Sequence, residues 1–248
     1  MKKFVDLNLR LPIAKHEVRR AEELIKRSAE LGYSSIGVPI TTEADQSEIQ
    51  DLERICNENK LDLIKRGDLK PKNVRDLLSS LRSLRRKREV IAVYCNSKSI
   101  ARQAARDHRV DLISFSSADP RRRFFDSAEA ELASKTSSAL EIDMAPLIML
   151  DGFPRARLIS RIRREVTIAK KLNVPIVMSS GTADKYLLRK PQDYVALAYL
   201  FDLDHQTALK ALSEAPLKIV ERNREKLSPN YVAPGVYIVR RGRDCHGV

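Results

Sequence analysis

Short apolar runs rich in β-branched residues alternate with amphipathic stretches along most of the chain. The runs recur at roughly 30-residue intervals, a spacing typical of βαβ units. They predict about seven strands, at residues 3–9, 35–39, 61–65, 90–95, 110–115, 140–144 and 175–178. The stretches between them predict helices at 15–31, 45–59, after Pro71, at 97–108, 127–135 and 154–172, with three more at 191–201, 205–212 and 215–226.

This alternation predicts an α/β fold. Continuous apolar runs such as residues 90–93 are typical of parallel strands that are buried on both faces. No strand is followed by the glycine-rich fingerprints of nucleotide-binding open sheets. We therefore expect a TIM-like (β/α) barrel with about seven parallel strands and extra C-terminal helices. The barrel is expected to form a single domain over residues 1–227, with a basic C-terminal tail at 228–248.

Length and composition narrow the function classes. A chain of 248 residues buries enough surface to fold without a disulfide or metal staple. No apolar run reaches the roughly 18–20 residues that span a bilayer, and no signal-peptide block follows the N-terminal lysines. Cys56, Cys95 and Cys245 are widely separated and fit neither a disulfide framework nor a CxxC site. These features predict a soluble intracellular protein with no membrane partner.

The charge is strongly positive and uneven. There are 46 Lys and Arg against 33 Asp and Glu, a net charge of +13. Residues 1–64 carry 10 basic and 12 acidic side chains (net −2), whereas residues 65–248 carry 36 and 21 (net +15). An excess of one sign on a compact body attracts polyanions, which makes nucleic acid the leading partner class. Any single cluster could equally be a solvated helix face.

Basic side chains gather at residues 82–88, 121–123, 155–164 and 240–243. From charge density and expected loop positions, the candidate RNA contacts are Arg66, Arg85, Arg86, Arg88, Arg106, His108, Arg121, Arg122, Arg123, Arg155 and Arg157. Arg161 and Arg164 are expected to lie on the solvated face of a long helix. Phe124 and Phe125 could stack on bases, but a buried anchor for their loop is favoured.

Polar residues follow several expected strands, where barrels of this type carry their functional groups. Glu141 and Asp143 are two residues apart on a strand and so point the same way, which suits acid–base work or a cation. Pairing with Arg66 or Arg10 is the favoured alternative. Residues 179–182 could hold a phosphate or form a plain serine-rich turn. The four histidines are scattered, so we predict no metal site and no catalytic residue.

Several short motifs occur in an order that resembles one family over residues 3–227. They are Asp6-Leu7-Asn8, the segment 65–69, Glu141-Ile142-Asp143, Ser179-Ser180-Gly181 followed by Pro191, and Ala208-x-x-Ala211-Leu212-x-x-x-Pro216 with Asn223. Together they resemble the ribonuclease P protein component 3 family. The resemblance implies a barrel related to the polymerase-and-histidinol-phosphatase (PHP) metal-dependent hydrolases. It also implies a protein subunit of the RNA-based endonuclease that removes the 5′ leader from precursor tRNA.

The first strand departs from the pattern of active PHP hydrolases. Those enzymes carry His-x-His after the aspartate-leucine pair, whereas this chain has Asn8 and Arg10. Neither residue suits a transition metal, so the resemblance implies that the scaffold has lost its metal site. The protein would then bind no cofactor itself, and the Mg²⁺ would be held by the RNA subunit.

The implied partners are the ribonuclease P RNA, ribonuclease P protein component 2, other protein subunits and precursor tRNA. The implied location is the cytoplasm for an archaeal source, or the nucleus or nucleolus for a eukaryotic one. Two other classes stay open from the residues alone. One is an independent metal-dependent phosphoesterase that uses Asp6, Glu141 and Asp143. The other is an enzyme that binds a small phosphorylated molecule through residues 179–182.

Overall fold

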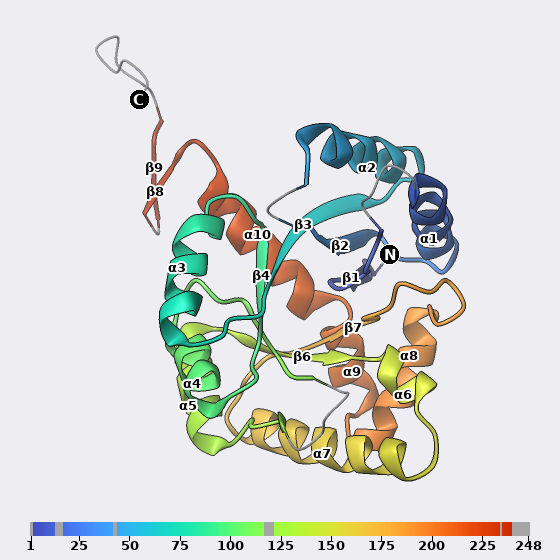
Figure 1. Ribbon diagram of the computed structural model, residues 1–248, viewed down its shortest axis with the longest axis vertical. Coiled ribbons are helices and arrows are strands. Elements are labelled where there is room, and N and C mark those ends of the chain that lie inside the picture. The colour runs from blue at the N-terminus through green and yellow to red at the C-terminus, as the bar shows by residue number, and fades with distance from the viewer. Residues whose placement is uncertain (1, 13–16, 42–43, 117–121, 234, 240–248) are drawn as a thin grey trace.

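The computed structural model describes residues 2–12, 17–41, 44–116, 122–233 and 235–239 (Figure 1). Its main sheet has seven parallel strands that follow one another in chain order. They are β1 (Val5–Asp6), β2 (Ser35–Pro39), β3 (Asp62–Leu69), β4 (Val90–Tyr94), β5 (Leu112–Ser114), β6 (Ala139–Asp143) and β7 (Ile176–Ser179).

The segments just beyond β1 and β7 close the sheet into a barrel. Leu9 and Thr182 form a parallel bridge, and Arg10 N donates to Thr182 O at 2.9 Å. Gly181 N donates to Asn8 O at 3.0 Å. Because the seventh strand returns to the first in this way, the prediction of a TIM-like barrel with about seven strands is confirmed.

Helices surround the strands (Figure 1). They are α1 (Val18–Glu30), α2 (Gln46–Glu58), α3 (Val74–Leu84), α4 (Lys98–Arg106), α5 (Ser127–Thr136), α6 (Ala145–Met149), α7 (Gly152–Lys171), α8 (Pro191–Ala198), the 3-10 turn η3 (Tyr199–Phe201), α9 (His205–Ala211) and α10 (Glu214–Leu227). Side-chain caps fix several starts: Asn73, Ser97, Asp126 and Asp204 each accept a hydrogen bond from the backbone N–H three residues ahead.

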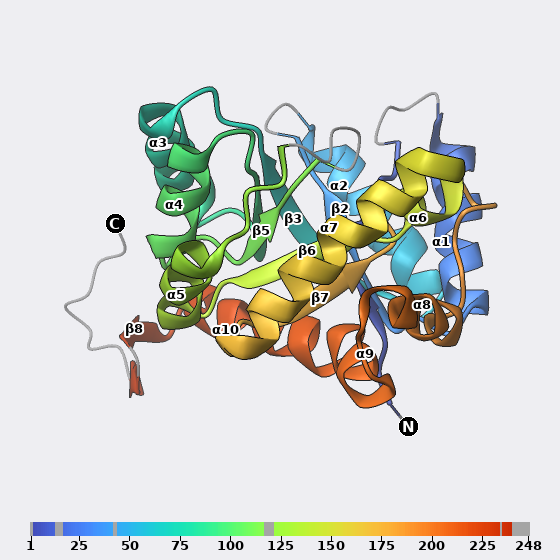
Figure 2. The ribbon, with the colours of Figure 1, turned by 90° about the horizontal axis from the view of Figure 1, so that it is seen from below.

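Apolar side chains fill the barrel and the layer between strands and helices. Val5, Leu7 and Ile64 lie inside the barrel, where Ile219 and Val220 of α10 pack against them. Figure 2 shows α9 and α10 beneath the strands. Asn223 of α10 donates to Glu89 O and Asp111 Oδ1, each at 2.8 Å. Helix α10 therefore closes the end of the barrel at which the strands begin.

Several element boundaries differ from the sequence prediction. The first strand, predicted at residues 3–9, is confined to Val5–Asp6, and β5 spans Leu112–Ser114 instead of 110–115. Strand β3 continues four residues past the predicted end at residue 65, because partners inside the barrel satisfy the charges of Arg66 and Asp68. The helix expected after Pro71 is present as α3, which begins three residues beyond that proline because Asn73 supplies its cap. Helix α7 begins two residues before Pro154.

Two short elements were not separated by the sequence pattern. The sequence pattern predicts no element for the apolar residues of α6, because five residues are too few to show a helical period. The stretch 191–201 is divided between α8 and η3. Asp202, the residue after η3, has a left-handed backbone with φ of 62° and ends the turn.

A small antiparallel hairpin follows α10. It consists of β8 (Tyr231–Ala233) and β9 (Val236–Tyr237). The basic residues Arg240, Arg241 and Arg243 of the predicted tail lie outside the described residues. Among the helices described, none combines the length and the apolar character that a bilayer crossing requires.

Candidate functional site

The carboxyl ends of β1, β3, β6 and β7 bring a polar cluster together inside the barrel mouth. Arg66 of β3 is at its centre, with none of its surface exposed. Its Nη1 and Nη2 donate to Oε1 and Oε2 of Glu141, the second at 2.8 Å, and its Nε donates to Asp68 at 2.6 Å. Nη1 also donates to the carbonyl oxygen of Leu7 at 2.9 Å. All three nitrogens of the guanidinium thus donate to partners within the barrel.

A second cation covers the neighbouring carboxylate. Arg10 Nη2 donates to Asp143 Oδ2 at 3.0 Å, and Asn8 Nδ2 donates to Asp143 Oδ1 at 2.9 Å. These are the two residues at which the resemblance to PHP hydrolases implied a missing His-x-His pair. The favoured prediction, that Glu141 and Asp143 pair with Arg66 and Arg10, is confirmed.

The pKa values of Glu141 and Asp143 are shifted in opposite directions. Burial opposes the ionisation of Glu141, but the charge and hydrogen bonds of Arg66 outweigh it and hold the pKa of Glu141 below its usual value. Burial and the nearby negative charge of Glu141 raise the pKa of Asp143 to about 6, against the pull of Arg10. The buried charge of Glu141 is therefore the one that Arg66 stabilises most directly.

The serine-rich turn after β7 is also used internally. Ser179 Oγ donates to Glu141 Oε1 at 2.9 Å, and Ser180 Oγ donates to Asn8 O at 3.2 Å. Ser180 N donates to Asp6 Oδ1 at 2.9 Å, which ties β7 to β1. Both serines are completely buried. Their hydroxyls close the barrel mouth, so this turn does not present them to a phosphate ligand.

The mouth does not fit the metal that the PHP fold would imply. Guanidinium groups take up the oxygens of Glu141 and Asp143 that would otherwise coordinate a cation. Nowhere in the described part of the chain do three or more His, Cys, Asp or Glu side chains form a group that could hold a metal ion. An Arg side chain is itself no metal ligand. The residues at the barrel mouth therefore form a network of ion pairs that does not suit a metal ion.

Three of the predicted RNA contacts are buried, and for these the prediction is corrected. Arg66 pairs within the mouth, as described above. Arg123 donates to both oxygens of Glu165, at 2.9 and 2.6 Å, and Arg88 donates to the carbonyl oxygens of Ile40 and Thr41. A buried guanidinium needs several acceptors, and the protein supplies them for Arg66 and Arg123, whereas the Nε of Arg88 has no partner among the described residues. These arginines are engaged within the fold, and little of their surface is left to contact an RNA.

The remaining candidates are half-buried or exposed. Arg85 pairs with Asp111 at 2.6 Å, and Arg155 donates to the carbonyl oxygens of Ile148 and Leu150, so both are partly committed to the fold. The exposed ones are Arg86, Arg106, His108, Arg122 and Arg157. Arg121 lies outside the described residues.

The exposed candidates do not form one patch. Helices α3 and α4 end where the barrel strands begin, so Arg86, Arg106 and His108 lie toward that end. The N-terminal part of α7, with Arg157, follows β6 and lies toward the barrel mouth. Near the first group, burial and the positive charges of Arg222 and Arg85 lower the pKa of Lys226. Arg85, Arg222 and Lys226 therefore add further cations at that end of the barrel.

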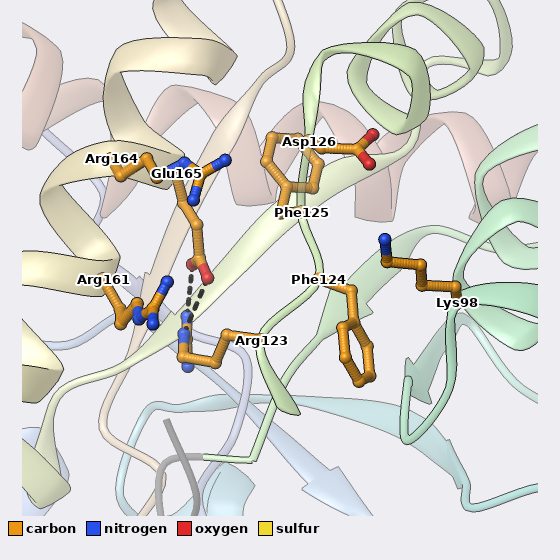
Figure 3. Close-up of a pocket in the computed structure, with 8 residues that line it drawn as sticks. All are labelled: Lys98, Arg123, Phe124, Phe125, Asp126, Arg161, Arg164 and Glu165. Atoms are coloured by element: carbon orange, nitrogen blue, oxygen red, sulfur yellow. Dashed lines mark hydrogen bonds and ion pairs between the residues drawn. The ribbon is translucent and has the colours of Figure 1, made fainter. Parts of the chain in front are cut away.

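Arg161 and Arg164 line cavities in the surface, although the sequence predicts that they are merely solvated. Arg161 and Arg164 of α7 lie beside a cavity of about 140 Å³, with Lys98 and Phe124 on its other side (Figure 3). Their spacing from Arg157, four and seven residues, places all three on one helix face, a signal that the sequence already contained. Phe125 is buried and meets Phe115 edge-to-face, which confirms it as an anchor.

Comparison with known families agrees with this architecture. A family model described as RNase P subunit p30 matches residues 3–228. The chain belongs to this family. Membership makes it a protein subunit of ribonuclease P, the ribonucleoprotein that processes tRNA. The p30 match also spans both the filled mouth and the basic face of α7.

Individual relatives support the p30 assignment. The ribonuclease P protein component 3 of Methanococcoides burtonii is 30% identical over 236 residues, which is 95% of this chain and 93% of the relative. That of Methanocaldococcus jannaschii is 26% identical and covers 90% of this chain and 96% of the relative.

A solved structure is similar over nearly the whole fold. It is described as archaeal ribonuclease P with mature tRNA, and the matching chain gives a TM-score of 0.83 at 26% identity, covering 97% of this chain and 100% of that one. A putative prolidase from Bifidobacterium longum, with a TM-score of 0.61 at 11% identity over 90% of this chain and 70% of that one, shares the fold alone.

Proposed function

We propose that this p30-family subunit binds the ribonuclease P RNA through its exposed arginines and stabilises the folded RNA. The RNA, with the Mg²⁺ it holds, carries out the removal of the 5′ leader from precursor tRNA. The observation that supports this division of labour is the mouth of the barrel, where Arg66 and Arg10 occupy the carboxylates Glu141 and Asp143. The scaffold of a hydrolase is retained, but its residues are engaged with one another.

The protein contributes to the enzyme by offsetting the electrostatic repulsion between phosphates of the folded RNA. Folding a large RNA crowds its phosphates together, and this repulsion opposes the compact shape. Arginines that face phosphates release condensed counterions, and their planar fork can hold two oxygens at once. The net charge of +13 and the surface arginines Arg86, Arg106 and Arg157 suit this task, since none of these three forms an ion pair with a described residue.

The same proposal names the partners. They are the ribonuclease P RNA, protein component 2 and other protein subunits, and precursor tRNA within the assembled enzyme. The solved relative contains mature tRNA, and the named component 3 relatives come from archaea. We therefore infer the cytoplasm as the compartment in which the enzyme works.

The test is the salt dependence of binding to ribonuclease P RNA. Replacing Arg86, Arg106 and Arg157 together by Ala should reduce the slope of log K against log salt by about 2–3, because each phosphate contact contributes about 0.7–0.9. The matched control replaces Arg27, Arg54 and Arg163, which are equally charged but paired with Glu30, Glu58 and Asp202.

The control should change the slope much less than the first triple variant. Equal slopes for the wild type and the first variant would refute the assignment of these arginines. The protein without RNA should not cleave precursor tRNA in the presence of Mg²⁺, Mn²⁺ or Zn²⁺, and cleavage that is lost in Asp143→Ala would instead favour a metal-dependent phosphoesterase.

A further inference from the structure

An exposed aromatic ring stands at the start of α7. Phe153, the second residue of the helix, leaves 70% of its surface in solvent. One turn further along, the guanidinium of Arg157 lies over the ring at 4.5 Å from its centre. With so much of its surface in solvent, the ring contributes almost nothing to the hydrophobic core. Its exposed position is therefore not explained by a packing role in the fold.

The helix face beyond Phe153 is cationic. Arg161 and Arg164 continue the line of Phe153 and Arg157, and the four side chains edge one open hollow of about 790 Å³ together with Ala156 and Ser160. At 1.5 Å per residue, this strip is about 16 Å long.

No acidic side chain among the described residues forms an ion pair with the arginines of this strip. Arg157, Arg161 and Arg164 form no ion pair within the described residues, whereas Arg163 on another side of the same helix pairs with Asp202 at 2.9 Å. The smaller cavity, which shares Arg161 and Arg164, adds Lys98 and Phe124 (Figure 3). The positive surface therefore extends from α7 toward α4.

A flat ring beside a row of unpaired guanidinium groups matches the chemistry of an unpaired nucleotide. Bases within a duplex present no open face, whereas a base in a loop or bulge can stack on an aromatic ring or on a guanidinium plane. The neighbouring phosphates then meet the arginines. An acidic peptide could pair with the arginines, but it would offer no planar group to stack on the ring of Phe153.

We propose that Phe153 and Arg157 form a stacking platform for an unpaired RNA base, whose flanking phosphates are held by Arg161 and Arg164. This rests on the proposed function and specifies the kind of RNA segment that this face takes. It also separates two roles on the surface: the platform recognises a single-stranded segment, while the arginines at the other end of the barrel contact phosphates of folded RNA.

The chain contains no Trp, which allows a direct test. Phe153→Trp introduces a single fluorophore at the platform, and a short single-stranded polyadenylate RNA should quench its emission by stacking. A duplex RNA of equal length should quench much less. The matched control is Tyr186→Trp, because Tyr186 is also exposed and lies beneath a cation, Lys185, at 5.4 Å, but that cation is paired with Glu23.

Equal quenching by single-stranded and duplex RNA, or equal quenching at positions 153 and 186, would overturn the proposal. Displacement of the polyadenylate by polyglutamate at equal charge concentration would also overturn it, and would point to an acidic protein partner instead.

Affinity measurements separate this proposal from the proposed function. Phe153→Ala should weaken binding of the polyadenylate about five-fold or more, Phe153→Leu should weaken it comparably, and Phe153→Trp should retain it, because a base stacks on a π face. If Phe153→Ala binds polyadenylate as the wild type does while the wild type still binds ribonuclease P RNA, the platform is refuted and the proposed function stands. If the wild type does not bind ribonuclease P RNA at all, the proposed function fails, and the fluorescence result decides the platform independently.

Discussion

Replacing Arg66 by Met should be among the most damaging single changes in this barrel. The side chains of Arg66 and Glu141 are both 0% exposed, so the substitution leaves a carboxylate buried without its cation. Removing one partner of a buried ion pair costs about 3–5 kcal/mol of the free energy of unfolding. Asp68 loses its hydrogen bond as well, which places Arg66→Met toward the upper part of that range.

The matched control is Arg54→Met. Arg54 forms an ion pair with Glu58 at 2.8 Å, but those side chains are 58% and 59% exposed. Solvent screens such a pair, so the control should lose less than about 1 kcal/mol. Adding Glu141→Gln to Arg66→Met should recover a substantial part of the loss, because the uncompensated buried charge is then gone.

The loss of stability in Arg66→Met should itself depend on pH. In the wild type, Arg66 lowers the pKa of Glu141 in the folded state, so the pair contributes stability above the usual pKa of Glu and loses it as the pH falls. Without Arg66, burial alone raises that pKa. The folded variant then binds a proton more tightly than the unfolded chain does, and its deficit relative to the wild type should shrink as the solution becomes acidic.

Urea unfolding followed by far-ultraviolet circular dichroism, at neutral pH and near pH 5, measures both effects. A loss in Arg66→Met no larger than that in Arg54→Met, or a deficit that does not shrink in acid, would refute the argument. If Arg66→Met does not fold, Arg66→Lys keeps the charge but loses the two-pronged contact, and it should be destabilised less than any foldable neutral variant at this position.

Three further predictions concern single positions. Burial raises the pKa of Glu129 to about 8, and its Oε1 has no hydrogen-bond partner among the described residues, so stability should fall as the pH rises from 4.5 to about 8. Glu129→Gln should remove this loss, at most about 5 kcal/mol, in pH-dependent thermal unfolding. Gly37→Ala would place Cβ 2.5 Å from the Leu7 carbonyl oxygen and should cost about 1–3 kcal/mol in urea unfolding, whereas Gly67→Ala meets only the flexible Arg88 side chain at 3.1 Å and should cost less. Asn73→Ala removes the cap that accepts from Asp76 N at 2.9 Å and should cost about 1 kcal/mol, while an unchanged midpoint would refute the capping role.

Local patterns predicted the elements well because each element depends on its own residues. The short apolar runs rich in β-branched residues located all seven barrel strands, and β2 has its predicted bounds at both ends. The errors in element boundaries occur where contacts with residues distant in the sequence override the local pattern. Strand β3 was predicted to end at residue 65, since a charged residue is seldom found inside a barrel unless another strand neutralises it.

The sequence by itself determined the alternation of strands and helices, the positive charge and the absence of the His-x-His pair in the first strand. Which arginines face solvent was decided by tertiary structure alone. Arg122 and Arg123 are adjacent, yet the first is exposed and the second is buried against Glu165, 42 residues away. Arg66 meets Glu141 across 75 residues. The physical reason is that the desolvation and pairing of a charged group depend on neighbours from other elements, and no local pattern of residues records them.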